Sequence, residues 1–310
     1  MMKNRTQTQT LRGIASGLLV VGLMATPGTA GRANAGGVSL PTGVSDITGT
    51  AEGLRYVQTA ITRFAGEGMA ASVAELRVVR DQAGILVAPV NAELSPVVTM
   101  GPDGAPITEM VPMTPRDPAA AMRESMDPLP GSSTSLAVPL AFDGAYWGNP
   151  VAQACFARYS DTWSWLDHCY RDYKLQNDGD PNHDYYGLQR YGTAGANSPW
   201  VVNYAVIGAA QSGSVSQTWV DWSPLGSTTG NCNSSTTIFI QSPVAGLQYS
   251  VVICEQWIMT KSNPTVSYSM EWYGSGTRTT RGIAFDISVS VAQGAWPQWS
   301  MPGQSWGSAI

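Results

Sequence analysis

Two stretches near the C-terminus alternate regularly between apolar and polar positions. From 283 to 291, isoleucine, phenylalanine and valine occupy the odd positions, and small or polar residues occupy the even ones. From 266 to 272, Glu271 and two serines alternate with larger apolar residues. A period of two places successive side chains on opposite faces of a strand, so we predict two half-buried β-strands.

Further strand candidates fill the same half of the chain. The segment 246–259 is long enough for one strand, and the turn 260–264 joins it to the next. Shorter candidates are 200–207, 217–222 and 235–241. The segments 166–175 and 184–194 are placed to pair across the turn 176–183, and 150–159 is read as a short helix. This pattern predicts a mainly β fold, an antiparallel β-sandwich or jelly roll.

The region 36–113 has a different pattern. Leu54, Val57, Ile61 and Phe64 follow the capping candidate Thr50 at helical spacing, which predicts one amphipathic helix. Two short strands are expected within 74–89, and a hairpin within 97–111. A small α+β domain and a partly disordered propeptide or stalk are both compatible with this pattern.

Composition places a boundary between the two regions. All 11 Trp lie between Trp147 and Trp306, and all four Cys lie after residue 150. The intervening stretch 114–140 is rich in Pro, Ser and Gly, as linkers are. We therefore expect four segments: 1–35, 36–113, a linker at 114–140 and a β domain at 141–310.

The first 35 residues have the order of a secretory signal peptide. Lys3, Arg5 and Arg12 precede an apolar run from Gly13 to Ala25, and Ala33-Asn34-Ala35 follows as a cleavage site. An uncleaved N-terminal anchor is the alternative. No later stretch is apolar enough to span a bilayer, so we expect a secreted, extracellular protein that has no membrane segment once mature.

Charge and cysteine content narrow the range of functions and structural sites that the chain can have. The net charge of −5 gives no support to nucleic-acid binding. Four cysteines in an exported chain imply disulfides, for which three pairings exist. We favour Cys155–Cys169 with Cys232–Cys254, because short-range pairs between neighbouring elements are simplest. A zinc site is the alternative, but the chain has no C-x-x-C and only two His.

Few residue sets carry catalytic or metal chemistry. With two His and no G-x-S-x-G, the chain gives little basis for a nucleophilic triad. Asp178, Asp180, Asn182 and Asp184 are a weak calcium candidate in a loop of oxygen ligands. His183 and Gln189 stand where a calcium-binding loop of the EF-hand type would place Gly and Glu, and a plain hairpin loop is the alternative. No cofactor is expected.

A glycoside hydrolase needs two carboxyl groups flanking the scissile bond. Glu255 and Glu271 are the two glutamates of the β half, and they fall on adjacent predicted strands. Whether both face one cleft depends on a strand register that the sequence leaves open. Glutamates on the solvated face of a sheet are the alternative.

Several aromatic residues fall in predicted turns or near strand ends, where flat rings can stack on sugar rings. A sandwich that uses tryptophan in its core is the alternative. The candidate ligand-binding residues are Trp219, Trp222, Trp296, Trp299 and Trp306.

Residues 155–310 also resemble a group of uncharacterised secreted actinobacterial β-rich proteins. The resemblance rests on the Trp-rich stretch from Cys155 to Cys169, the turn from Lys174 to Asp180 followed by Asp184-Tyr185-Tyr186, and the later cysteine pair. It covers about half the chain and implies export and a β fold. It assigns no active residues.

The sequence therefore favours a non-catalytic role, namely binding at the cell envelope or to an extracellular polysaccharide. The first alternative is a jelly-roll glycosidase that uses Glu255 and Glu271. The second is a structural surface protein without a small ligand.

Overall fold

A computed structural model gives the fold of the chain. It describes residues 40–100, 105–117, 119, 126, 145–160, 164–225, 228–241, 246–262, 265–277 and 280–309, with side chains left out at 100, 228–257, 259, 275 and 277.

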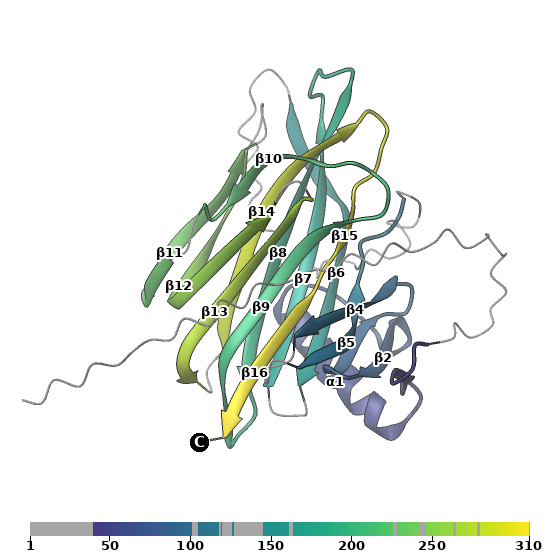
Figure 1. Cartoon of the computed structure of the whole chain (residues 1–310), viewed down its shortest axis with the longest axis vertical. Helices are drawn as coiled ribbons and strands as arrows, with labels where there is room; N and C mark the ends of the chain where they lie inside the picture. Colours follow the sequence, from purple (N-terminus) through teal and green to yellow (C-terminus); the bar gives the residue numbers. More distant parts are fainter. Residues whose placement is uncertain are drawn as a thin grey trace, which may run out of the picture.

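The larger of two main sheets has eight antiparallel strands in the order β1-β2-β3-β6-β7-β8-β14-β10 (Figure 1). Their bounds are β1 Ser45–Asp46, β2 Leu76–Asp81, β3 Gly84–Pro89, β6 Tyr146–Ser160, β7 Ser164–Gln176, β8 His183–Ala196, β10 Thr218–Ser223 and β14 Arg281–Ala292.

The smaller sheet has the order β11-β12-β13-β9-β15, and β16 also pairs with β9. These strands are β9 Trp200–Ser212, β11 Thr228–Gln241, β12 Gly246–Ser262, β13 Ser267–Thr277, β15 Gln298–Ser300 and β16 Gly303–Ala309. A separate hairpin pairs β4 Leu94–Met100 with β5 Pro106–Pro112.

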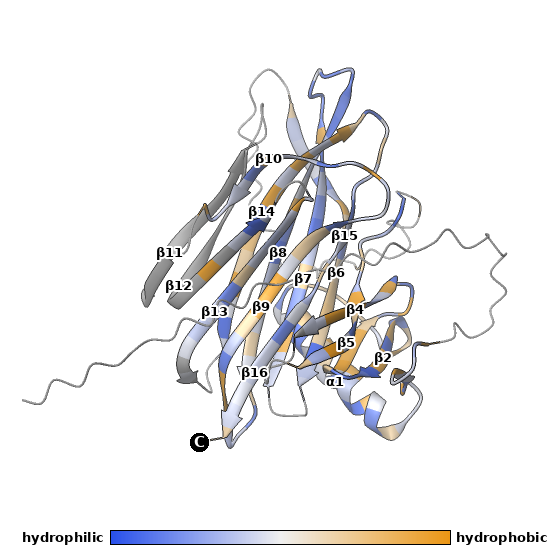
Figure 2. Cartoon of the chain, in the orientation of Figure 1, coloured by the Kyte–Doolittle hydropathy of each residue, from blue (hydrophilic) through white to orange (hydrophobic). Residues whose placement is uncertain are grey.

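The two main sheets pack face to face, which confirms the mainly β, sandwich-type fold. The alternation seen in the sequence puts Phe285 of β14 and Tyr268 of β13 on the facing sides, with ring centroids 4.8 Å apart. Figure 2 shows the same alternation of hydrophobic and hydrophilic residues along β14. The odd-numbered residues from Ile283 to Val291 are buried, so this strand supplies one side of the core.

The predicted helix is present as α1, Ala51–Gly66. Thr50 caps it, because the Gly53 backbone N–H donates to Thr50 Oγ1 over 3.0 Å. Val57, Ala60 and Phe64 are buried on its inner side. Gly53 is required here, since a Cβ would come within 2.0 Å of the Ile47 carbonyl oxygen. Among the described residues, no helix combines the length and apolar character needed to cross a membrane.

Strands on the two sides of the boundary expected before residue 141 belong to one sheet. β3 pairs with β6, so the N-terminal strands extend the large sheet. Arg158 of β6 donates to both carboxylate oxygens of Asp81 in β2, each over 2.8 Å, and both side chains are buried. The Thr114 backbone N–H donates to the Trp299 carbonyl over 2.8 Å. The buried Arg158–Asp81 pair therefore links the described N-terminal strands to the rest of the large sheet.

The short helix predicted at 150–159 is wrong, because these residues lie within the strand β6. Their register with β7 places Cys155 directly opposite Cys169, and the two form a disulfide with a Cα–Cα distance of 4.0 Å. One of the two predicted disulfides is thus confirmed. A helix would turn most of this apolar stretch away from the sheet, whereas the strand buries it.

Three predictions fall wholly or partly outside the described residues. The predicted signal peptide 1–35 does so entirely, and the linker 114–140 does so for most of its length. The side chains of Cys232 and Cys254 are also outside. The backbone ladder pairs Asn231, the neighbour of Cys232, with Cys254.

Candidate ligand-binding site

Three strands of the smaller sheet bring aromatic rings together on its outer face. β9 lies between β13 and β16, and the register pairs Tyr204 with Tyr273 on one side and with Trp306 on the other. The neighbouring positions Ala205 and Trp272 are buried and belong to the core-facing side. Because faces alternate along a strand, the three rings share the outer side. We call Tyr204, Tyr273 and Trp306 the aromatic platform.

The rings of the platform contact one another closely. Tyr204 and Trp306 stack with centroids 4.4 Å apart and an interplanar angle of 12°. Tyr204 meets Tyr273 edge to face, with centroids 4.9 Å apart at 66°. Such pairs each contribute about 0.5–1.5 kcal/mol beyond their buried area. All three side chains are half-buried, so the rings are fixed by their neighbours and still reach solvent.

Glu271 is on the same outer face, two positions before Tyr273. The Tyr273 hydroxyl donates to Glu271 Oε2 over 2.7 Å, and only 7% of Glu271 is exposed. Burial, followed by the charge of Glu271, raises the pKa of Tyr204 well above its ordinary value. Burial and the hydrogen bond to Glu271 raise the pKa of Tyr273 in the same direction. Both hydroxyls therefore stay protonated at physiological pH and remain donors.

This arrangement suits non-covalent recognition. Half-exposed rings offer apolar faces to the C–H surface of a flat ligand, and the phenol and carboxylate groups offer hydrogen bonds at the margin. On the neighbouring β16, Gln304 Nε2 donates to Thr99 Oγ1 of β4 over 3.2 Å, which attaches the β4–β5 hairpin beside the platform.

The five tryptophans predicted as ligand contacts have different environments. Trp306 is in the platform. Trp299, 1% exposed, and Trp296, 8% exposed, are buried. Trp296 Nε1 donates to the Pro115 carbonyl over 2.9 Å, and its ring packs on Tyr186. The expectation of exposed rings at 296 and 299 is therefore corrected, because both rings lie in the core.

Trp219 and Trp222 form a second, separate aromatic group on β10. Lys261 Nζ lies 3.3 Å from the centroid of Trp222 and 4.7 Å from that of Trp219. Trp219 Nε1 donates to the Ser262 carbonyl over 3.1 Å. A cation already occupies the ring face of Trp222, so this group connects β10 to β12.

The strand register separates the two glutamates of the glycosidase alternative. Glu271 pairs with Ile258, while Glu255 pairs with Gly230 on the other side of β12. Positions 255 and 258 are three residues apart and so fall on opposite faces of a regular strand. This register does not favour a cleft flanked by both carboxyl groups.

The calcium candidate uses its oxygens internally. Asp178 Oδ1 accepts from the Asp180 backbone N–H, and Asp180 Oδ1 accepts from that of Asn182. Asp184 is buried and lies 3.0 Å from Lys174 Nζ. No group of three or more metal-ligating side chains occurs among the described residues. The loop has the hydrogen bonds of consecutive Asx turns.

The outer face of the larger sheet is built differently. At one level the register aligns Gln153, Arg171, Gln189, Asp286 and Ser223 across five neighbouring strands. We call these residues the polar row, and all five are buried. Neither carboxylate oxygen of Asp286 has a hydrogen-bond partner in the described part of the chain, and burial raises the pKa of Asp286 well above its ordinary value.

The helix α1 covers part of the same face. Arg63 lies 3.7 Å from Asp167 Oδ2 and 3.6 Å above the centroid of Trp165. Burial raises the pKa of Asp167 to about 7, although Arg63 opposes that shift. Thr193 Oγ1 donates to Glu67 Oε1 over 2.7 Å at the end of the helix. These contacts fix the helix on the sheet.

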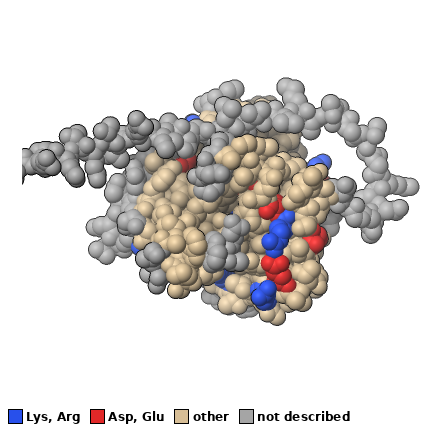
Figure 3. Space-filling model, turned by 60° about the horizontal axis from the view of Figure 1, so that its bottom comes forward, with Lys and Arg blue, Asp and Glu red and all other residues tan. Residues whose placement is uncertain are grey.

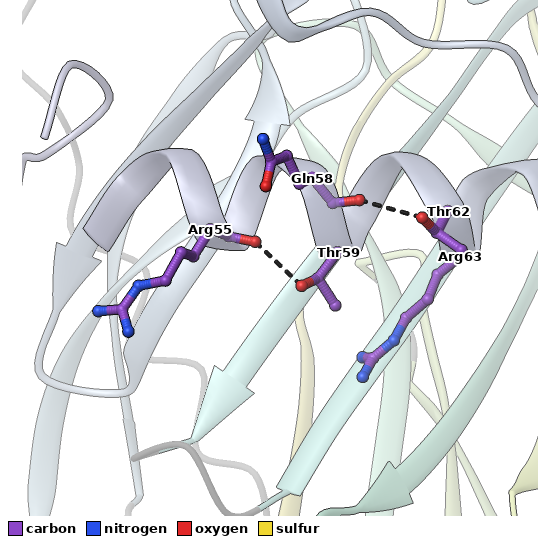
Figure 4. A pocket seen from close by; sticks show the side chains of 5 residues that line it. All are labelled: Arg55, Gln58, Thr59, Thr62 and Arg63. Atoms are coloured by element: carbon purple, nitrogen blue, oxygen red, sulfur yellow. Dashed lines mark hydrogen bonds between the residues drawn. The ribbon is translucent and has the colours of Figure 1, made fainter. Parts of the chain in front are cut away.

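A hollow of about 520 Å³ lies along α1, lined by Arg55, Gln58, Thr59, Thr62 and Arg63 (Figure 4). Both threonine hydroxyls donate to backbone carbonyls of the helix, and Arg63 is engaged with Asp167 and Trp165. Figure 3 shows that charged side chains of both signs gather in one band of the face it views, while most of the described surface there is uncharged. Three of the five residues that line the hollow thus have intramolecular partners for their side chains.

His168 is a core residue. Arg190 Nη2 lies 2.9 Å from His168 Nδ1, and both side chains are fully buried. A guanidinium only donates, so Nδ1 accepts and the imidazole is neutral. Burial, aided by Arg190, lowers the pKa of His168 well below its ordinary value. This geometry agrees with a structural role.

The comparisons with known proteins add no family to this description. Neither a protein-family model nor a curated protein matches the chain. Two of the platform residues, Tyr204 and Tyr273, were not among the ligand-binding candidates predicted from the sequence. Tyr273 shares the polar parity of its strand with Glu271, whereas Tyr204 is flanked on its own parity by Val202 and Val206, so only the β9–β13 register shows that the two rings meet.

Proposed function

We propose that this protein acts outside the cell and binds a polysaccharide of the cell envelope or the extracellular space without cleaving it. The observation that carries the proposal is the aromatic platform: Tyr204 packs between Tyr273 and Trp306, all three rings are half-buried on the outer face of a sheet, and Glu271 lies beside them. Sugar rings present apolar C–H faces and peripheral hydroxyls, which match stacked rings bordered by hydrogen-bonding groups.

The extracellular setting is supported by two features. One is the signal-peptide pattern of residues 1–35, and the other is the Cys155–Cys169 disulfide, a bond that persists in oxidising compartments. The acidic net charge agrees with a partner other than an anionic surface.

The test is a panel of insoluble and soluble polysaccharides, with protein depletion and released reducing ends measured in the same tubes. We expect depletion without release on at least one polymer. Trp306→Ala should weaken that binding at least about tenfold, because one stacked ring is lost. Trp219→Ala is the matched control, because it removes a tryptophan of the other aromatic group. This variant should bind the polymer as tightly as the natural chain does.

Three results would overturn the proposal. Release of reducing ends that Glu271→Gln abolishes would establish a glycosidase. Equal losses in Trp306→Ala and Trp219→Ala would remove the platform as the binding surface. Depletion by none of the polymers would favour a structural surface protein.

A further inference from the structure

The edges of the two main sheets differ in how they are protected. An unpaired edge strand presents backbone N–H and C=O groups that can pair with another chain, and proteins limit this with short strands, charges, bulges or covering elements. In the larger sheet, β1 has two residues, while β10 carries Asp221 and a register shift next to it. Both edges of that sheet are therefore poor templates for pairing.

The β15/β16 edge of the smaller sheet is also occupied. β15 has three residues. The Ser305 carbonyl of β16 accepts from Ser164 Oγ over 2.9 Å, and Gln304 bonds to the β4–β5 hairpin. The Ser305 carbonyl and the Gln304 side chain are therefore already hydrogen-bonded, which limits the pairing of another strand with β16.

β11 is longer than these edge strands and carries no charge, although a register shift interrupts its first part. It has 14 residues and is the last strand in the order of its sheet, with β12 as its only strand partner in the described part of the chain. Figure 1 shows it at the outer margin of the sandwich. Its sequence, Thr-Thr-Gly-Asn-Cys-Asn-Ser-Ser-Thr-Thr-Ile-Phe-Ile-Gln, contains no charged residue and no proline. The register shift lies between Asn231 and Ser235, so 235–241 runs in regular register with β12.

We infer that β11 pairs antiparallel with β11 of a second copy of this chain, through residues 235–241. An identical strand related by a two-fold axis is always available as an antiparallel partner. The segment is rich in β-branched and aromatic residues and has no charge to repel its copy. Such a dimer joins the two smaller sheets into one continuous sheet.

The pairing has a consequence for binding that goes beyond the single platform. A two-fold axis perpendicular to the joined sheet keeps the outer faces of both copies on the same side. The two platforms would then share one face, which provides bivalent attachment to a repeating polymer. The inference about β11 stands whether or not the platform binds sugar, because its test measures mass and not ligand binding.

The test is sedimentation velocity of the purified full chain from low micromolar to millimolar concentration. We expect the mass to double with concentration. Because 235–241 pairs with itself about its central residue, Thr237→Lys places two positive charges diagonally across the paired strands and should weaken the dimer severalfold. Thr218→Lys is the matched control, because it introduces the same change at an exposed position of the edge strand β10. This variant should dimerise as the natural chain does.

Hydrogen exchange of the natural chain provides a second readout that needs no variant. The amides of 235–241 should exchange more slowly at high than at low concentration, whereas those of β10 should not change. A mass that stays monomeric throughout the range, an equal effect of both substitutions, or exchange in 235–241 that is independent of concentration would overturn the inference.

Discussion

The outer face of the smaller sheet presents three packed aromatic rings, whereas the outer face of the larger sheet buries a row of polar side chains across five strands. Both faces use the same device, alternation along long antiparallel strands. Alternate positions along each strand face away from the core, and the two faces differ in the residue types at these positions. Rings at these positions remain half-buried and available, while the polar row is buried and contributes to pH dependence.

This contrast separates binding from stability. Changes on the platform should reduce ligand affinity and leave the fold intact. Changes on the outer face of the larger sheet should alter the free energy of unfolding and leave affinity unchanged.

The largest expected effect is the pH dependence of stability caused by Asp167. Its pKa is raised by burial to about 7, so the folded state retains a proton that the unfolded state releases above pH ~4. This contribution to stability is complete below about pH 4 and is lost as the pH rises to about 7. The shift corresponds to roughly 4 kcal/mol as an order of magnitude.

Urea unfolding between pH 4 and 8 measures this dependence. The natural chain should become more stable on acidification, and Asp167→Asn should flatten the profile in that interval. Asp286, whose pKa burial raises well above its ordinary value, adds to the same trend. A profile unchanged by Asp167→Asn would show that the carboxyl is ionised in the folded protein.

The Cys155–Cys169 disulfide comes next in expected size. The two cysteines are 14 positions apart, and a loop of that length contributes about 3 kcal/mol in the chain-entropy account. Replacing both cysteines with alanine should lower the denaturant midpoint by a corresponding amount. Polysaccharide affinity, measured under folding conditions, should not change. If the affinity fell together with the stability, binding and stability would not be separate properties of the two faces.

Glu271→Gln should have an intermediate effect on the platform side. The substitution keeps the shape and an acceptor for Tyr273 but removes the charge, so the charge-assisted bond is weakened. We expect affinity for a bound polymer to fall about threefold, or roughly 0.7 kcal/mol, with thermal stability nearly unchanged. Unchanged affinity would show that the carboxylate has no part in recognition.

Tyr273→Phe should have the smallest effect. It removes the hydroxyl that donates to Glu271 and keeps the ring that meets Tyr204 edge to face. Affinity should fall by less than twofold, as titration calorimetry can measure. A large loss would mean that the hydroxyl, and not the stacked rings, dominates binding.

Periodicity predicted the strands well where one face is buried. The alternation at 283–291 and 266–272 and the helix following Thr50 all appear in the structure. The stretch 150–159 was misread because its residues suit either a helix or a buried strand, and pairing with β7 decides between them. The β3–β6 pairing and the buried Arg158–Asp81 contact join residues on the two sides of the predicted boundary, and local pattern did not show them because both are long-range.

The candidate site was only partly accessible from the sequence. Trp306, Trp296 and Trp299 were predicted from their places in turns or near strand ends, and the structure leaves Trp306 half-buried while Trp296 and Trp299 lie in the core. Tyr204 and Tyr273 are distant in sequence and meet through register alone. Local pattern specifies which face a residue occupies, but strand register determines which residues share it.

Hydroxyl-radical footprinting of the chain with and without a bound polysaccharide, read by mass spectrometry, tests the central claim most directly. If the platform binds the polymer, Trp306 and Tyr204 should be protected from oxidation, and Trp219, a half-buried ring of the other aromatic group, should be oxidised equally in both samples. The account would be contradicted if the polymer protected Trp219 from oxidation and left Trp306 and Tyr204 unprotected.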